Sequence, residues 1–310
     1  MTTTNHKTIA SYFEEYLLEC EYSKGLRPKT IKTYTDVFNF FSKLMPEVKY
    51  MDEFQPYVIQ EFFKRLGIRA KAKEKPMKAS SIRTYFNKLQ AFISWLERKG
   101  FIDKGFSKQL VKPPNPRYED EKALSEQTVS KLISTIHLHT VDDVFMQKRD
   151  LVIIYLLLYT GIRRGELLGL STYDIDFQNK TLFVNGKHSK SKKSRYIPLH
   201  FTLLTHLKSY LSYRKSMKST CDALIVSTKN DTPFTDHGLK HWISKYNRIS
   251  GIKFHVHQFR HTFACNLAKK NASVISIKNV LGHSSLRMTE HYLRSIKTES
   301  ARVHINNLGY

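Results

Sequence analysis

The chain has 310 residues, of which 41% are hydrophobic and 12% aromatic, so it can bury a core in one large or two ordinary domains. Its three cysteines are far apart and outside any C-x-x-C spacing, which excludes a disulfide framework and a cysteine zinc cluster. A formal net charge of +24 at pH 7, spread along the whole chain, favours a nucleic acid as partner over a membrane surface.

The sequence also indicates a soluble protein. The longest apolar run, residues 151–159, is too short to cross a bilayer, which requires about 20 residues. The N-terminal residues lack the charged and then apolar layout of a signal peptide. We therefore expect a cytoplasmic protein with no membrane partner.

Residues 7–112 carry apolar side chains at spacings of three and four, which is typical of amphipathic helices. The predicted helices cover residues 9–17, 28–44, 56–66 and 81–99. Pro28 suits the first turn of the second helix, Ser80 is the expected N-cap of the fourth, and Gly100 is expected to end it. Four apolar stripes of this kind predict a helical bundle.

The stretch 112–122 holds three prolines and mixed charges, so it cannot continue a helix, and we expect a linker at residues 113–124. After it, Ser125 is expected to cap a helix. Residues 144–160 are almost all apolar, which predicts a helix buried inside the second domain.

Strand-like patterns follow. Residues 173–177 alternate, residues 181–184 favour a strand, and residues 195–198 resume a strand after a basic loop, which predicts a small antiparallel sheet. From His200 the helical spacing returns. Breaks are expected at Gly238, Gly251, Asn271 and Gly282. The predicted fold class is mainly α with a small antiparallel β-sheet.

Four separated fragments carry residues suited to phosphoryl transfer. They are TGIRRGELLGL at 160–170, GKHSKSKKSRYIPL at 186–199, HVHQFRHTFA at 255–264 and LGHSSLRMTEHYL at 281–293. Together they resemble the tyrosine recombinase, or phage integrase, family, whose pattern is T-G-x-R-x-x-E-L, a hairpin-loop Lys before V/I-P-L, H-x-x-R, L-G-H and a later Tyr. The matching positions are Arg163, Lys190, His257, Arg260, His283 and Tyr292. Six positions in the right order are very improbable by chance.

These residue types suit the cleavage of a phosphodiester. Arg163 and Arg260 stay charged and can hold a phosphate in forked geometry. His257 shares a helix face with Arg260 and would assist Tyr292, whose phenol has a pKa of about 10 and must lose its proton as it attacks. His283 would donate a hydrogen bond to the phosphate.

The general acid that protonates the departing 5′ oxygen is a choice between two lysines. Lys187 follows Gly186 and matches the G-K dipeptide of many family members. The family, however, places its lysine eight residues before the proline of V/I-P-L, which for Pro198 is Lys190. We therefore assign Lys190. The resemblance further implies that Glu166 supports the active-site cations.

His257 and His261 are four residues apart and could imitate a helical metal pair. Gln258 stands where a zinc protease would need Glu, and no third ligand is evident, so no metal is expected. His261 and His255 are expected to be structural or DNA-facing neighbours.

The resemblance implies a helical core-binding domain at residues 1–112 that clamps double-stranded DNA, and a catalytic domain at 125–310 with a C-terminal tail from 293. It also implies a covalent 3′-phosphotyrosyl intermediate without metal, cofactor or ATP, and a tetramer on DNA. One alternative is a type IB-like topoisomerase, which shares the chemistry but works as a monomer. The other is a non-catalytic DNA-binding regulator of the same fold, against which the intact set of six positions argues.

Overall fold

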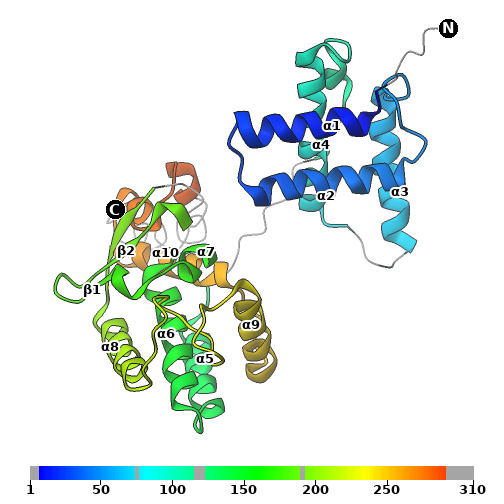
Figure 1. Ribbon diagram of the computed structural model, residues 1–310. Helices are drawn as coiled ribbons and strands as arrows, with labels where there is room; N and C mark the ends of the chain where they lie inside the picture. The colour runs from blue at the N-terminus through cyan, green and yellow to red at the C-terminus, as the bar shows by residue number, and fades with distance from the viewer. Residues whose placement is uncertain (1–6, 73, 75–76, 115–122, 189–192, 291–310) are drawn as a thin grey trace, which may run out of the picture. The chain divides into compact units, whose positions relative to one another are not determined.

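The computed structural model describes residues 7–72, 74, 77–114, 123–188 and 193–290 (Figure 1). The chain divides into two compact units, Met1–Tyr118 and Glu119–Tyr310. Both are built mainly of helices, and a three-stranded antiparallel sheet belongs to the second unit, so the predicted fold class is confirmed. None of the described helices is both long and apolar enough to span a membrane.

The first unit contains the four predicted helices. They are α1 (Ile9–Leu18), α2 (Pro28–Leu44), α3 (Pro56–Ala72) and α4 (Ala79–Lys99). A π-helical turn, Glu19–Ser23, continues α1, and a 3-10 turn, Phe106–Gln109, follows α4. The core is aromatic: the Phe13 ring stacks on Phe38 at 3.9 Å between centroids and meets the edge of Phe92 at 5.2 Å.

Two helix boundaries differ from the sequence prediction. Helix α3 continues six residues past Leu66, to Ala72. Ser80 is not the N-cap of α4, because the helix already begins at Ala79 and its N-cap is Lys78, whose carbonyl accepts the Ser81 and Ile82 N–H groups. The hydroxyl of a cap contributes only about 1 kcal/mol, which backbone hydrogen bonding can override.

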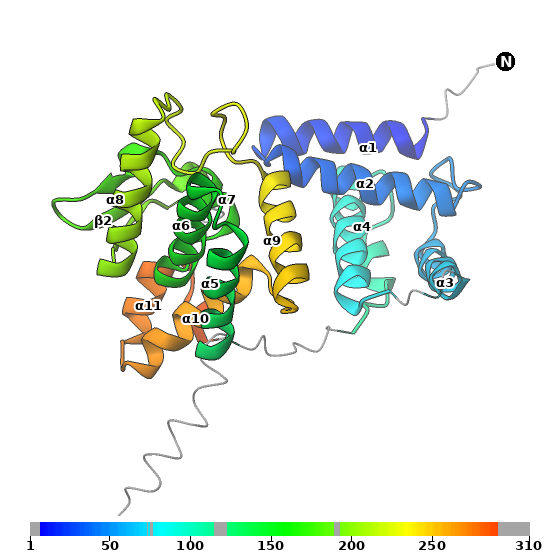
Figure 2. The same ribbon diagram turned by 90° about the horizontal axis from the view of Figure 1, so that it is seen from below.

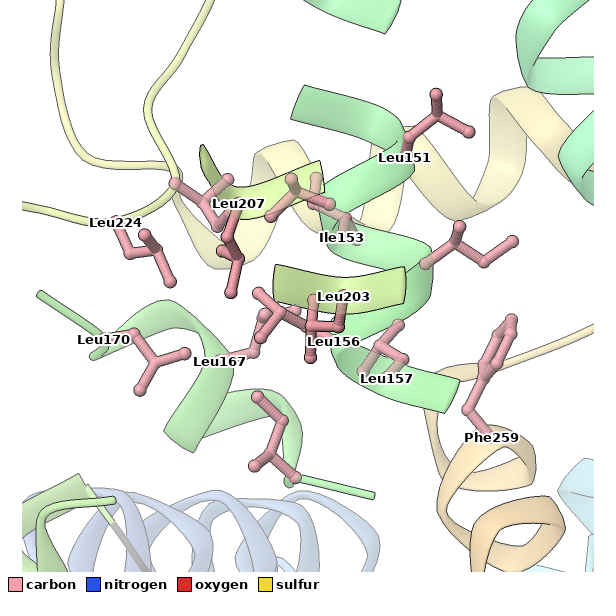
Figure 3. Close-up of a cluster of buried hydrophobic side chains, with 14 of the residues drawn as sticks. Leu151, Ile153, Leu156, Leu157, Leu167, Leu170, Leu203, Leu207, Leu224 and Phe259 are labelled. Carbon is pink, nitrogen blue, oxygen red and sulfur yellow. The ribbon is translucent and has the colours of Figure 1, made fainter. Parts of the chain in front are cut away.

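Helix α6 (Val144–Thr160) is the centre of the second unit, as predicted. It packs against α5 (Glu126–His139) on one side and α8 (Phe201–Ser216) on the other (Figure 2). Figure 3 shows leucine and isoleucine side chains of α6 converging with Leu203 and Leu207 of α8 and with Phe259. Ser125 caps α5 by accepting the Thr128 N–H, so that prediction is confirmed as well.

The sheet has the order β1-β2-β3, with all pairs antiparallel. Its strands are β1 (Ile175–Asp176), β2 (Thr181–Val184) and β3 (Arg195–Pro198). The first strand is shorter than the alternation at 173–177 predicts. Residues Thr172–Asp174 form a 3-10 turn instead, because Ser171 and Asp174 cap each other's backbone, and this leaves Tyr173 exposed.

The remaining helices are α7 (Arg164–Leu168), α9 (Asp236–Ser250), α10 (Val256–Lys269) and α11 (Val274–Leu281), and residues 286–290 are also helical. The break expected at Gly238 is wrong: this glycine lies in the first turn of α9 and donates its N–H to Thr235 Oγ1 at 3.0 Å. The actual interruption is residues 217–235. Buried Arg214 holds it by donating to backbone carbonyls within 219–224.

Gly161 ends α6 and turns the chain toward the residues of the site. Its φ is +58°, and a Cβ there would lie 2.5 Å from the ring of Phe263. Gly251 ends α9 with a similar φ of +70° but has nothing within 4 Å of its virtual Cβ.

We expect Gly161→Ala to lower the free energy of unfolding of the second unit by about 2–4 kcal/mol, because overpacking adds to backbone strain. Gly251→Ala carries the strain alone and should cost about 1 kcal/mol. Chemical denaturation of both variants measures the difference. Equal losses would show that the Phe263 ring moves aside at no cost.

Candidate active site

The site begins at the N-terminus of the short helix α7. Arg163 is its N-cap residue, and its backbone N–H donates to Glu166 Oε2 at 2.8 Å. The Arg163 side chain also reaches this carboxylate, with Nη1 3.0 Å from Oε1. Because Gly161 turns the chain two residues before Arg163, the end of buried helix α6 sets where Arg163 begins α7.

Three arginines from separate elements meet at the carboxyl end of α11. Arg260 on α10 donates to the Leu281 carbonyl at 2.7 Å and to the Gly161 carbonyl at 2.8 Å. Arg163 donates to the Gly282 carbonyl at 3.3 Å, and Arg195 on β3 donates to the Val280 carbonyl at 2.6 Å. A helix C-terminus carries partial negative charge, so it stabilises this concentration of cations.

Helices α10 and α11 lie side by side (Figure 2), and the site takes one histidine from α10 and one from the residues that follow α11. His257 lies in the first turn of α10, which His255 caps together with Gln258. His283 follows Gly282, whose φ of +65° ends α11. The His283 ring is buried, and its Nδ1 is 2.8 Å from the hydroxyl of buried Thr289.

Desolvation and the surrounding cations keep both imidazoles neutral at physiological pH. Burial, followed by the charges of Arg260 and Arg163, lowers the pKa of His283 from 6.5 to about 3. Desolvation and then the charge of Arg260 also lower the pKa of His257, but this residue is exposed, so water moderates the shift relative to that of buried His283. A neutral imidazole can still donate one hydrogen bond or accept a proton, and it adds no further repulsion to a group of arginines.

These pKa values predict a loss of stability in mild acid. As the pH falls below 6.5, the unfolded chain binds a proton that the folded, buried His283 does not bind, so folding becomes less favourable. For His283 the loss reaches about 2 kcal/mol at about pH 5. The lowered pKa of Glu166 affects stability only near and below its ordinary value of 4.5, so His283 dominates this window.

Chemical denaturation at about pH 7 and about pH 5 tests the prediction, with His283→Gln as the comparison. This variant should lose less stability between the two pH values than the parent protein does. Identical pH dependence would mean that His283 binds a proton equally well in the folded and the unfolded chain.

Glu166 is a buried carboxylate, 1% exposed, held by two arginines. Arg195 Nη2 lies 2.8 Å from Oε2 and Arg195 Nη1 3.1 Å from Oε1. Burial raises the pKa of Glu166, but the hydrogen bonds and charges of Arg195 and then Arg163 outweigh it and hold the pKa at about 2. Glu166 is therefore ionised at physiological pH and in mild acid.

Sequence reasoning missed Arg195, which it treats only as the start of a strand. A signal was present, because Arg195 and Ile197 are two residues apart on one strand and so project to the same face. Ile197 is buried in the core. A charged residue on the inward face of a short strand requires a buried partner.

The structure brings together five of the residues selected from the sequence: Arg163, Glu166, His257, Arg260 and His283. Lys190 and Tyr292 lie outside the described residues. Lys187 is exposed. His261 is buried, with its Nε2 3.5 Å from Cys265 Sγ, so it is a packing neighbour.

This arrangement can bind and polarise a phosphodiester. Two of its arginines come from positions selected for forked phosphate contacts, and backbone carbonyls orient both. Donors fixed before the reaction stabilise developing charge without the cost of reorganisation. The site is therefore suited to phosphoryl transfer.

Comparison with known proteins agrees with this chemistry. A family model described as the phage integrase family matches residues 122–299. The tyrosine recombinase XerC of Bacillus pumilus is 29% identical over 321 residues, covering 98% of this chain and 97% of that protein. The tyrosine recombinase XerA of Pyrococcus furiosus is 31% identical over 289 residues, covering 93% and 91%.

Among solved structures, a lambda integrase tetramer bound to a Holliday junction is similar in fold. The TM-score is 0.71 at 19% identity, covering 93% of this chain and 78% of that one. The likeness extends over both units of the chain.

Proposed function

The chain belongs to the phage integrase family and is a tyrosine recombinase, and we propose that it cleaves and rejoins duplex DNA through a 3′-phosphotyrosyl intermediate at Tyr292. In this reaction the Tyr292 oxygen bonds to phosphorus, the bond to the 5′ oxygen breaks, and that oxygen takes a proton. Attack by the 5′ hydroxyl of another strand reverses the steps. The phosphotyrosyl bond conserves the energy of the phosphodiester, so neither ATP nor a metal is required.

The observation that supports this proposal best is the meeting of Arg163, Arg260 and His283 at the end of α11. Arg163 and Arg260 would hold the non-bridging oxygens of the scissile phosphate, and His283 would donate to one of them. His257, neutral in the structure, would accept the phenolic proton of Tyr292. Lys190 would protonate the leaving 5′ oxygen.

We further propose that the two units share the work of binding DNA. Residues 1–112 would act as a core-binding domain, residues 113–124 as the linker, and residues 125–310 as the catalytic domain. The net charge of +24 suits a protein that neutralises many phosphates. We expect the protein to act on DNA in the cytoplasm.

The relative solved as a tetramer on a Holliday junction supports a tetramer here too. The tail from residue 293 would contact the neighbouring protomer. Neither the topoisomerase nor the non-catalytic regulator is favoured, since the relatives that match nearly the full chain are tyrosine recombinases by name.

Covalent capture from cells tests the function and identifies the DNA site in the same step. A tagged protein is purified under denaturing conditions, and the DNA that stays attached is sequenced. We expect enrichment of one short site, with DNA joined through its 3′ phosphate.

A strand-exchange assay on two copies of that site, with EDTA and without ATP, should then yield recombinant products. Relaxation of supercoils without exchange would favour the topoisomerase. Absence of any covalent DNA would contradict the proposed chemistry.

A further inference from the structure

The charge balance around Glu166 is unusual, because one buried carboxylate is shared by two arginines with different places in the site. Arg163 belongs to the proposed phosphate clamp. Arg195 does not match any of the six motif positions. Both guanidinium groups lie within hydrogen-bonding distance of the same carboxylate.

The two arginines do not share Glu166 equally. Arg195 contacts both carboxylate oxygens in a forked pair, at 2.8 and 3.1 Å. Arg163 contacts one oxygen through Nη1, at 3.0 Å, while its Nη2 donates to the Gly282 carbonyl at 3.3 Å. Most of the carboxylate's hydrogen-bonding capacity is therefore met by Arg195 together with the Arg163 backbone N–H.

Arg195 is itself fixed from a second direction. Its Nε donates to the Val280 carbonyl at 2.6 Å, and its guanidinium packs against Gly282, where a Cβ would lie 2.9 Å from Nη1. The side chain is 8% exposed. Its position is thus set by α11 and β3 and does not depend on Arg163.

We propose that Arg195 is a positioning residue that serves as the principal counter-ion of Glu166 and thereby keeps the charge of Arg163 directed at the scissile phosphate. Among the described residues, Glu166 forms ion pairs with Arg163 and Arg195. If Arg195 is removed, Arg163 is the partner that remains for the buried carboxylate. A forked Arg163–Glu166 pair then competes with the forked Arg163–phosphate pair. The inference rests on the proposed function of the site.

If Arg195 has this role, a second substitution at Glu166 should partly restore the activity that is lost with Arg195. Arg195→Met should slow formation of the covalent complex by roughly 100-fold, because Arg163 is drawn toward Glu166. Glu166→Gln removes the negative charge and keeps an oxygen for the Arg163 backbone N–H. The double variant Arg195→Met/Glu166→Gln should therefore react at least about tenfold faster than Arg195→Met alone.

The experiment measures single-turnover formation of the covalent complex on the DNA site found by covalent capture, together with DNA affinity and thermal unfolding. Arg214→Met is the matched control, since Arg214 is likewise buried and donates to backbone carbonyls, but those lie in residues 219–224. At a temperature where each variant is folded, Arg214→Met should react within about threefold of the parent. If Arg195→Met does not fold, Arg195→Gln, which keeps hydrogen-bond donors but not the charge, makes the same comparison with and without Glu166→Gln.

Rescue of the covalent-complex rate by Glu166→Gln, measured at a temperature where both variants are folded, supports the proposal, because recovery of stability alone would not change the rate of protein that is already folded. A double variant that is as slow as the single variant, or slower, overturns it. An Arg195→Met protein as fast as the parent also overturns it. Failure of the parent protein to form covalent DNA would instead count against the proposed function.

Discussion

Replacing Tyr292 with Phe is expected to abolish the covalent protein–DNA complex and to leave DNA affinity within about twofold of the parent, because the ring is kept and the attacking oxygen is lost. The proposed roles of the described residues do not include a nucleophile: Arg163, Arg260 and His283 are assigned as phosphate donors and His257 as the base. Cleavage should therefore fall by a factor of roughly 10⁴ or more.

The measurement is a denaturing gel of protein mixed with a nicked DNA substrate that traps the cleaved state. Tyr173→Phe is a suitable control, since this tyrosine is 81% exposed and lies in the same unit. It should form the covalent complex at the rate of the parent. A covalent adduct on the Tyr292→Phe protein would place the nucleophile elsewhere, and mass spectrometry of the attached peptide would identify it.

Local patterns predict much of the fold. The apolar stretch 144–160 predicts a helix buried inside its domain. Ile153 and Leu156 are indeed fully buried in α6. The helix ends at Gly251 and Gly282 are also confirmed, because each glycine adopts a positive φ that other residues rarely take. These features depend on few neighbouring residues.

Features that depend on distant partners could not be predicted in this way. Gly238 breaks a helix by propensity, but Thr235 accepts its N–H and places it in the first turn of α9. The interruption at 217–235 depends on Arg214, whose guanidinium replaces helical hydrogen bonds with contacts to carbonyls several residues away. A single sequence does not show that such an arginine is buried.

The same distinction applies to the candidate site. Motif spacing selects Arg163, Arg260 and His283, and the structure brings all three to the end of α11. Arg195 has no motif to select it. Its importance arises from the pairing of β2 with β3, which directs it toward Glu166. The alternation along β3 marks Arg195 as inward-facing, but its partner Glu166 is identified only when the strands and helices are assembled.

The carbonyl groups at the end of α11 stabilise the cluster of arginine side chains in the absence of DNA. Arg260 and Arg195 would repel each other if left in an apolar interior. Each donates to a different carbonyl of one helix end, and Glu166 supplies a full negative charge beside them. Folding therefore already holds the donors of the site in place, and a bound phosphate is stabilised by that order.

The second large effect concerns the proton that the departing 5′ oxygen requires. Lys190→Ala is expected to cleave ordinary DNA roughly 10²–10⁴ times more slowly than the parent, because an alkoxide leaves poorly without a general acid. Sulfur in place of the bridging 5′ oxygen is a much better leaving group and needs no proton. The Lys190→Ala protein should therefore recover nearly the parental rate on the sulfur-bridged substrate, measured in single-turnover assays.

Lys187→Ala is the matched control, because this exposed lysine precedes Lys190 by three residues in the same basic stretch. It should react within a fewfold of the parent on both substrates. Rescue of Lys187→Ala by sulfur, in place of Lys190→Ala, would move the general acid to Lys187. Rescue of neither would mean that another group supplies the proton. His283 would be tested next, since it lies beside the arginines proposed to bind the phosphate, and its neutral ring carries one N–H proton at physiological pH.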